Sequence, residues 1–226
     1  MNRDSNVYTI IYASVMVVLV AVLLAVTSES LRSYQKKNEA DDKRQQILRS
    51  VNVSVSGSET EKKYNELIKE SFLVNDKGER VDGDAFAVDV AKMFSKNTYP
   101  VFVAQIDGST KYVLAMYGTG LWGPIWGYIS VNEDKNSVFG ADFSHQGETP
   151  GLGAEIATLT FSSQFAAKQI FPNNEFKSIA VVKPGKTAQG QDYVDGISGG
   201  TITSNAVDQM LRNSLKNYVD FLNAKK

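Results

Sequence analysis

Apolar residues follow two patterns along this chain: one uninterrupted run near the start, and short amphipathic segments after it. Residues 7–26 contain no charged side chain. A helix of about 20 residues, rising about 1.5 Å per residue, crosses a hydrocarbon core of roughly 30 Å. A cleaved signal peptide is the alternative, but its apolar core is normally about 7–15 residues long. The run therefore predicts a retained single-pass transmembrane anchor.

Apolar positions spaced three and four residues apart predict helices in the rest of the chain. The first follows the apolar run directly and is rich in charged residues, which is typical of a solvated juxtamembrane helix. The second has its apolar residues on one side, the last carries an apolar stripe, and a turn or two of helix is expected in the third range. The expected ranges are 28–51, 59–72, 84–95, 155–171 and 204–223.

Alternating apolar and polar residues predict strands, and turn residues separate them. Asp107-Gly108 is a hairpin turn between two of these strands. The expected strands are 101–106, 112–117, 127–132, 137–144 and 179–182. Hairpins grouped together with flanking helices indicate an α+β fold with an antiparallel sheet.

Composition limits the possible functions. The chain has 226 residues and a formal net charge of −1, which provides no bulk attraction to nucleic acid. It contains no cysteine, which excludes disulfides, cysteine nucleophiles and iron–sulfur clusters on its own thiolates. The patterns divide the chain into a tail and anchor (1–27), a juxtamembrane helix and link (28–57) and one folded domain (58–226).

The most informative segment is Asp195-Gly-Ile-Ser-Gly-Gly-Thr201, which leads into the last predicted helix. Glycines before a helix let a phosphate approach the free N–H groups of its first turn. Ser204 is the expected N-cap, with Asp208 in the first turn. The segment therefore predicts a phosphate group beside Thr201.

This segment also resembles the Asp-Gly-x-Ser/Thr-Gly/Ser-Ala-Thr motif of flavinylated proteins. In that family a flavin transferase links FMN through its phosphate to the final threonine, which matches Thr201. Gly200 departs from the motif, since alanine is usual there. The resemblance implies a covalent FMN phosphoester on Thr201.

Two further strings support the resemblance. Glu148-Thr-Pro-Gly-Leu-Gly153 resembles the signature of FMN-binding domains, and Gly118-Thr-Gly-Leu-Trp122 resembles a segment of the C-type subunit of the sodium-translocating NADH:quinone oxidoreductases. The two flavin motifs stand in the family's order, and the resemblance covers most of the chain, from the N-terminal apolar helix to the C-terminal helix. The resemblance implies an electron-carrying subunit of a respiratory NADH:quinone reductase, with no complete active site on this chain alone.

The same resemblance implies the surroundings of the protein. Expected partners are the other subunits of the complex, a flavin transferase and the lipid bilayer of the bacterial inner membrane. It also places the FMN domain on the periplasmic side. The basic residues indicate the opposite, because Arg32, Lys36 and Lys37 follow the apolar run and only Arg3 precedes it. We follow the resemblance, since long domains are translocated largely regardless of charge.

The predicted flavin site combines the anchor threonine with polar and apolar neighbours. Trp122 and Leu152 are expected to cover the ring, with Trp126 as a less favoured candidate. Glu148 and Thr149 are expected to contact the ring or the ribityl chain. The predicted cofactor-binding residues are Thr201, Ser198, Gly199, Gly200, Thr203, Glu148, Thr149, Leu152, Trp122 and Lys183. No metal cluster or catalytic triad is recognisable, and the lone His145 is typical of a structural histidine.

Two other functions remain open at the level of sequence. One is the G-type subunit of the Rnf electron-transport complex, which is built on the same plan. The other is a membrane-anchored binding domain without a cofactor, in which the glycine segment is a simple helix cap.

Overall fold

The computed structural model describes residues 6–224 and divides into two compact units, Met1–Lys43 and Arg44–Lys226. The boundaries expected at residues 27 and 57 stay predictions. Arg3, used above to argue orientation, lies outside the described residues.

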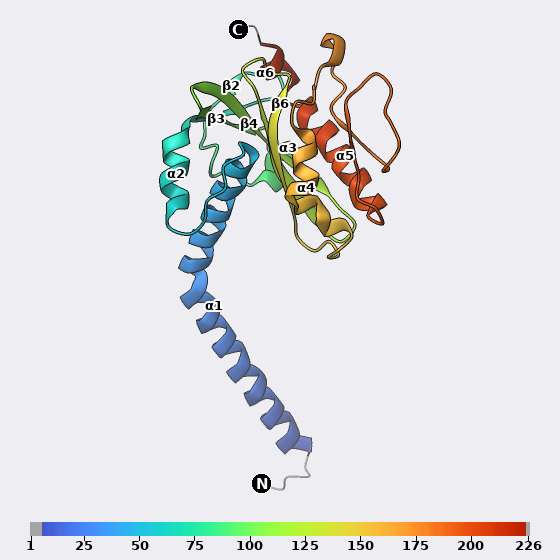
Figure 1. The fold of residues 1–226 in the computed structure, drawn as a ribbon. Coiled ribbons are helices and arrows are strands. Elements are labelled where there is room, and N and C mark those ends of the chain that lie inside the picture. Colours follow the sequence, from blue (N-terminus) through green and yellow to red (C-terminus); the bar gives the residue numbers. More distant parts are fainter. Residues whose placement is uncertain (1–5, 225–226) are drawn as a thin grey trace. The chain divides into compact units, whose positions relative to one another are not determined.

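The element order is that of an α+β protein (Figure 1). The helices within the described residues are α1 (Asn6–Ser50), α2 (Glu59–Leu67), α3 (Met93–Lys96), α4 (Leu159–Ser162), α5 (Thr201–Lys216) and α6 (Val219–Asn223). The strands are β1 (Ile68–Val74), β2 (Arg80–Val81), β3 (Tyr99–Ile106), β4 (Ser109–Thr119), β5 (Pro124–Val131), β6 (Val138–His145), β7 (Ala180–Val182) and β8 (Tyr193–Asp195). Short 3-10 turns are η1 (Val90–Lys92), η2 (Gly153–Ala157), η3 (Ser163–Phe165) and η4 (Pro172–Asn174).

The first unit contains the apolar part of α1 and the charged part that follows it as far as Lys43. Its most apolar window has a mean hydropathy of 2.8, and none of that window is buried. Within residues 6–224, α1 is the one helix long and apolar enough to cross a membrane. The helical state expected over residues 7–26 and 28–51 is confirmed.

The second unit is built on a six-stranded sheet with the order β2-β1-β3-β4-β5-β6, in which every neighbouring pair is antiparallel. This confirms the antiparallel hairpins. Asp107 and Gly108 join β3 to β4 with φ values of 50° and 79°, and left-handed values at both positions suit the twist of a two-residue hairpin.

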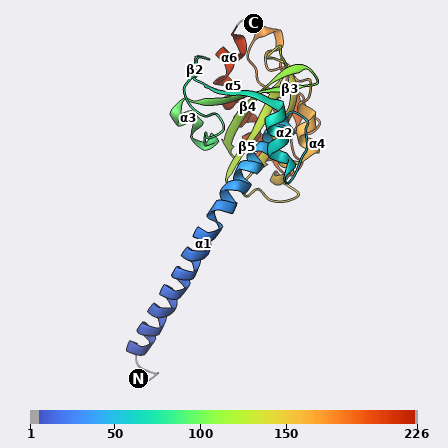
Figure 2. The same cartoon turned by 90° about the vertical axis from the view of Figure 1, so that its left-hand side faces the viewer.

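Helices cover both faces of the sheet, as Figure 1 and Figure 2 show for the second unit. On one face, the end of α1 binds β5 and β6. The Trp126 indole donates to the side-chain oxygen of Gln46, and the Ser130 hydroxyl donates to the Ser50 carbonyl. Arg49 forms a bidentate salt bridge with Asp142. On the other face lie α5 and the segment around α4.

Around α4, the side chains Phe161 and Phe165 pack on Phe143 of β6. Ile47 and Leu48 at the end of α1, and Val51 just after it, are also fully buried. Buried apolar side chains therefore fill the space between the sheet and the helices on each of its two faces.

The helix predicted over residues 59–72 is wrong in its second half. α2 ends at Leu67, and Ile68 has the extended values φ −83° and ψ 111°. From there the chain forms β1, in which Phe72 to Val74 pair with Tyr99 to Val101 of β3. The apolar spacing fits either period, and pairing with β3 decides the outcome because it buries three successive apolar side chains.

The single helix predicted over residues 155–171 is also wrong. The segment forms η2, α4 and η3, and Ala167 then takes a positive φ of 64°. Past that point the backbone bonds the start of β6: the N–H of Val138 donates to the carbonyl of Lys168, and that of Ala167 to the carbonyl of Val138. An unpaired sheet edge supplies these partners, so edge pairing outweighs the helical period.

The last predicted helix begins three residues earlier than expected and is divided in two. α5 starts at Thr201 with Gly200 as the N-cap, so the expected N-cap at Ser204 is wrong. Asp208 consequently lies in the second turn, where its carboxylate accepts from the N–H of Val181 in β7. The short strand β8, which pairs in parallel with β7, carries the motif residue Asp195 and was not predicted.

Candidate functional site

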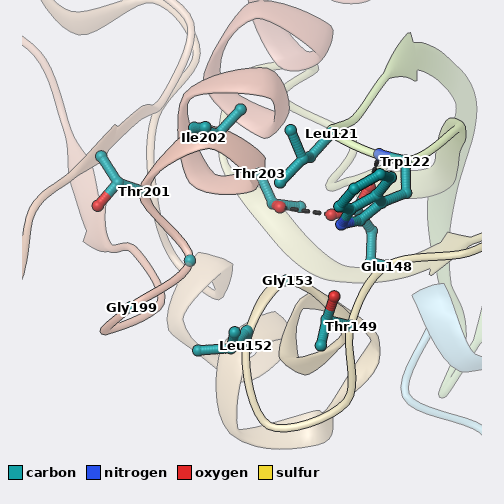
Figure 3. Close-up of a pocket in the computed structure, with 11 residues that line it drawn as sticks. Leu121, Trp122, Glu148, Thr149, Leu152, Gly153, Gly199, Thr201, Ile202 and Thr203 are labelled. Atoms are coloured by element: carbon teal, nitrogen blue, oxygen red, sulfur yellow. Dashed lines mark hydrogen bonds between the residues drawn. The ribbon is translucent and has the colours of Figure 1, made fainter.

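A cavity of about 260 Å³ lies beside the start of α5 (Figure 3). Three segments that are distant in the sequence form it: the turn between β4 and β5, the loop after β6, and the glycine loop that leads into α5. The lining residues are Leu121, Trp122, Glu148, Thr149, Leu152, Gly153, Gly199, Gly200, Thr201, Ile202 and Thr203. The fold therefore brings the three sequence motifs together.

Most of the predicted site residues line this cavity. Those that do are Thr201, Gly199, Gly200, Thr203, Glu148, Thr149, Leu152 and Trp122. Ser198 and Lys183 are not among the lining residues, and both are exposed. Trp126 does not line the cavity either, since its half-buried indole donates to Gln46.

Thr201 is the first residue of α5 and is exposed. Figure 3 shows its side chain on the outer side of the glycine loop, turned away from Glu148 and Trp122. The N–H groups in the first turn of a helix lack intrahelical acceptors and carry the positive end of the helix dipole. The Thr201 hydroxyl thus lies at an exposed helix start that favours negative charge.

Ser204 holds this loop closed. Its hydroxyl donates to the Gly200 carbonyl at 2.9 Å and accepts from the Ile197 N–H at 2.8 Å. Gly199 has a φ of +77°, which side chains rarely adopt, and a Cβ there would lie 2.8 Å from a methyl group of Leu152. The loop is therefore compact and presents bare backbone next to Leu152.

Glu148 is the buried polar centre of the site, with 4% of its surface exposed. One carboxylate oxygen accepts from the Thr203 hydroxyl at 2.5 Å, and the other accepts from the Trp122 N–H at 2.9 Å. Burial raises the pKa of Glu148, but the hydrogen bonds from Thr203 and from the N–H groups of Trp122 and Leu121 outweigh it. The net pKa lies below the ordinary value, so the carboxyl is ionised at neutral pH.

Two glycines leave room for this carboxylate. A Cβ on Gly120 would lie 2.5 Å from one of the Glu148 oxygens. A Cβ on Gly153 would collide with the other oxygen and with the Thr203 hydroxyl. Both positions thus require a residue without a side chain.

His145 supports the same loop. Its Nδ1 accepts from the Glu148 N–H at 3.2 Å. This agrees with the structural role expected for the lone histidine. Within residues 6–224, no group of histidine, aspartate and glutamate side chains is arranged to hold a metal ion.

The rest of the cavity wall is apolar and unusually exposed. Trp122 is 67% exposed and Ile202 58%, and Leu121 and Leu152 are also exposed. Sequence reasoning did not select Leu121, Ile202 or Gly153. No local signal marks Ile202, because single exposed apolar side chains are common on protein surfaces and the predicted helix began only at Ser204.

The cavity is suited to binding rather than to acid–base chemistry. Its lining contains no histidine, lysine or arginine, and its one carboxylate is held by hydrogen bonds. It offers a hydroxyl at a helix N-terminus on one side and apolar side chains on the other. A ligand with an anionic end and a flat apolar end matches this arrangement.

Comparison with known proteins agrees with this description. Residues 120–216 match the FMN-binding domain family. The C-type subunit of the sodium-translocating NADH-quinone reductase of Vibrio anguillarum is 31% identical over 91% of this chain and 89% of its own length.

Two crystal structures show the same fold. The C-type subunit of the reductase from Parabacteroides distasonis is 67% identical, with a TM-score of 0.85 over 87% of this chain and 98% of that chain. The NqrC protein of Shewanella oneidensis is 26% identical, with a TM-score of 0.69 over 83% of this chain and 97% of that chain. This chain therefore belongs to the NqrC family, the C-type subunits of the sodium-translocating NADH-quinone reductases.

Proposed function

We propose that Thr201 carries FMN through a phosphoester, that a flavin transferase attaches it, and that the protein relays electrons between other subunits of a sodium-pumping NADH:quinone reductase. The single observation that carries the proposal is the exposed Thr201 hydroxyl at the start of α5, beside a cavity formed by the other two motifs.

The surroundings of Thr201 fit a phosphate. A phosphoester at the first helical residue lies close to the unpaired N–H groups of the first turn. Gly199 and Gly200 bring backbone without side chains to the same place. The chain's own contribution is thus to hold the anionic end of the cofactor with backbone groups.

The cavity fits part of a flavin ring. At about 260 Å³ it is smaller than the roughly 300–1,000 Å³ of sites that enclose a whole drug-sized ligand. Trp122 and Leu152 offer apolar surface to one part of the ring, and Thr149 offers a hydroxyl. FMN supplies the electron transfer when it is bound. A partly covered ring suits a relay, since an exposed edge is within reach of partner subunits.

We also propose that the apolar part of α1 crosses the bacterial inner membrane and that the FMN domain lies on the periplasmic side. The charge-free run and its length support the crossing. The family resemblance supports the orientation against the basic residues that follow the run.

The intact mass of the protein, made together with a flavin transferase, tests the attachment. We expect the wild type to gain the mass of one FMN and Thr201→Ala to gain none. Ser198→Ala is the matched control, because it removes a second exposed hydroxyl from the same loop and should keep the flavin. Flavin retained on Thr201→Ala contradicts Thr201 as the attachment site. A wild type that gains no flavin contradicts the proposal as a whole and favours a cofactor-free binding domain.

A further inference from the structure

Glu148 differs from the rest of its loop in exposure. Thr149, Pro150, Gly151 and Leu152 are exposed, whereas Glu148 is 4% exposed. A buried, ionised carboxylate is costly unless several donors satisfy it. The hydrogen-bond donors that surround Glu148 therefore indicate the role of its carboxylate.

Those donors come from two other parts of the fold. Trp122 and Leu121 donate backbone N–H groups from the turn between β4 and β5. Thr203 donates its hydroxyl from the first turn of α5. Figure 3 shows the Glu148 and Thr203 side chains pointing toward each other on the inner wall of the cavity.

We infer that Glu148 is a positioning residue whose carboxylate ties the Leu121–Trp122 turn to the N-terminus of α5 and thereby sets the cavity beside Thr201. It acts through the protein and not as a direct ligand. That the cavity serves a flavin rests on the function proposed above. The link that Glu148 forms between the turn and the helix does not depend on that proposed function.

The geometry of the three segments supports this role. Both carboxylate oxygens already accept hydrogen bonds from the protein, so little capacity is left for a ligand. A negative charge near the first turn of α5 is stabilised by the helix dipole. Gly120 and Gly153 lie against the two oxygens, so the carboxylate fills space that a side chain at either position would need.

The test compares Glu148→Ala, Glu148→Gln and Thr203→Val. Each variant also carries Trp126→Phe, so Trp122 is the only tryptophan of the two in the chain that remains. Fluorescence anisotropy of Trp122 in flavin-free protein reports the mobility of the turn. Intact mass over time reports flavin attachment by the transferase. Glu175→Ala is the control, because it removes an exposed glutamate that pairs with Lys177.

We expect Glu148→Ala to lower the Trp122 anisotropy and to slow flavin attachment by roughly 10- to 100-fold, since misplacing reacting groups by about 1 Å costs rates of that order. Glu148→Gln keeps an accepting oxygen for the turn and an amide that can donate to Thr203. The rate of flavin attachment to Glu148→Gln should therefore stay within about threefold of the control rate. For Thr203→Val we expect an anisotropy and an attachment rate between those of Glu148→Ala and Glu148→Gln. The double variant of Thr203→Val and Glu148→Ala should differ little from Glu148→Ala alone, because both substitutions remove the same contact.

Wild-type anisotropy in Glu148→Ala overturns the inference, whether or not the flavin is lost. Normal anisotropy with lost flavin assigns Glu148 to direct ligand binding instead. If Glu148→Ala does not fold, the Thr203→Val protein decides by the same two measurements. Because the anisotropy is measured without flavin, failure of the Thr201 attachment does not affect this outcome.

Discussion

Four consecutive residues at the start of α5 show how one turn of helix separates side chains of similar chemistry. Thr201 is exposed at the rim, Ile202 presents apolar surface, Thr203 is buried against Glu148, and Ser204 closes the glycine loop. Each step along a helix rotates the side chain by about 100°. Sequence reasoning placed the helix start at Ser204, so it could not assign these hydroxyls to their separate directions.

The ionised state of Glu148 predicts how stability depends on pH. Its folded pKa lies below the ordinary glutamate value of about 4.3. The contribution of the carboxylate to stability is therefore complete above about pH 4.3 and is lost as the pH falls through the folded value. We expect the difference in free energy of unfolding between wild type and Glu148→Gln to shrink as the pH falls below about 4.3.

Denaturant titrations across roughly pH 3–7 measure this difference. His145 is the ionisable group whose charge acts on Glu148, so the same pair is also compared in a His145→Gln background. A difference that does not change with pH contradicts a depressed pKa at Glu148.

A second prediction at this scale concerns Gly153. Its replacement by alanine places a methyl group against the Glu148 carboxylate and the Thr203 hydroxyl. We expect Gly153→Ala to destabilise the domain by about 1–3 kcal/mol, as overpacking of a buried site does. Gly147→Ala is the matched control, since its Cβ would meet only the Trp122 carbonyl, at 3.8 Å. Equal melting temperatures of the two variants would be inconsistent with a tightly filled site.

At the scale of elements, the hairpin strands β3 to β6 and the short strand β7 were predicted, whereas β1, β2 and β8 were not. The hairpin from β3 to β4 follows from its alternation and from the Asp107-Gly108 turn, both of which are local signals. Residues 59–72 and 155–171 have helical spacing, yet each gives up part of it to pair with an edge of the sheet. The local pattern of apolar residues carries no information about which sheet edge has unpaired backbone groups. The two helix predictions are therefore wrong because strand pairing in the folded domain decides the structure of these segments.

α5 and α6 are joined to the sheet at Tyr218, which no local pattern identifies as special. Its buried hydroxyl accepts from the Ala115 N–H at 3.3 Å and donates to the Pro100 carbonyl at 3.0 Å, so it bridges β3 and β4. We expect Tyr218→Phe to lower the free energy of unfolding by about 1–3 kcal/mol, because two buried backbone groups lose their partner.

Chemical denaturation of Tyr218→Phe and Tyr193→Phe tests this bridge. Tyr193 in β8 is only partly buried. Tyr193→Phe should therefore lower the free energy of unfolding by well under half as much as Tyr218→Phe. A Tyr218 variant as stable as the wild type would mean that the hydroxyl is not needed where β3 and β4 meet it.

At the scale of the whole molecule, the core lies within Arg44–Lys226, and the large apolar side chains between Val7 and Val26 are exposed. Exposed apolar surface of that length is stable in lipid and not in water. We expect a chain lacking residues 1–27 to stay in the supernatant after ultracentrifugation and to accept flavin. Full-length protein should sediment with membranes. A truncated chain that still sediments with vesicles would reveal a second membrane-binding element.

Orientation depends on which of two influences is stronger. The basic residues Arg32, Lys36 and Lys37 follow the apolar run and favour retaining that flank in the cytoplasm. That rule applies to short flanks, and a domain of this size is translocated largely regardless of its charge. We therefore expect a reporter fused to the C-terminus to be active when it requires the periplasm, and a cytoplasmic reporter at the same position to be silent.

Changing Arg32, Lys36 and Lys37 to glutamine provides the matched control for orientation. If translocation of the domain overrides the basic flank, the periplasmic signal should remain unchanged in this variant. If the flank opposes translocation in a measurable fraction of molecules, the signal should rise. Activity of the cytoplasmic reporter alone would place Thr201 inside the cell. The flavin transferase and the electron partners would then have to be sought on the cytoplasmic side of the membrane.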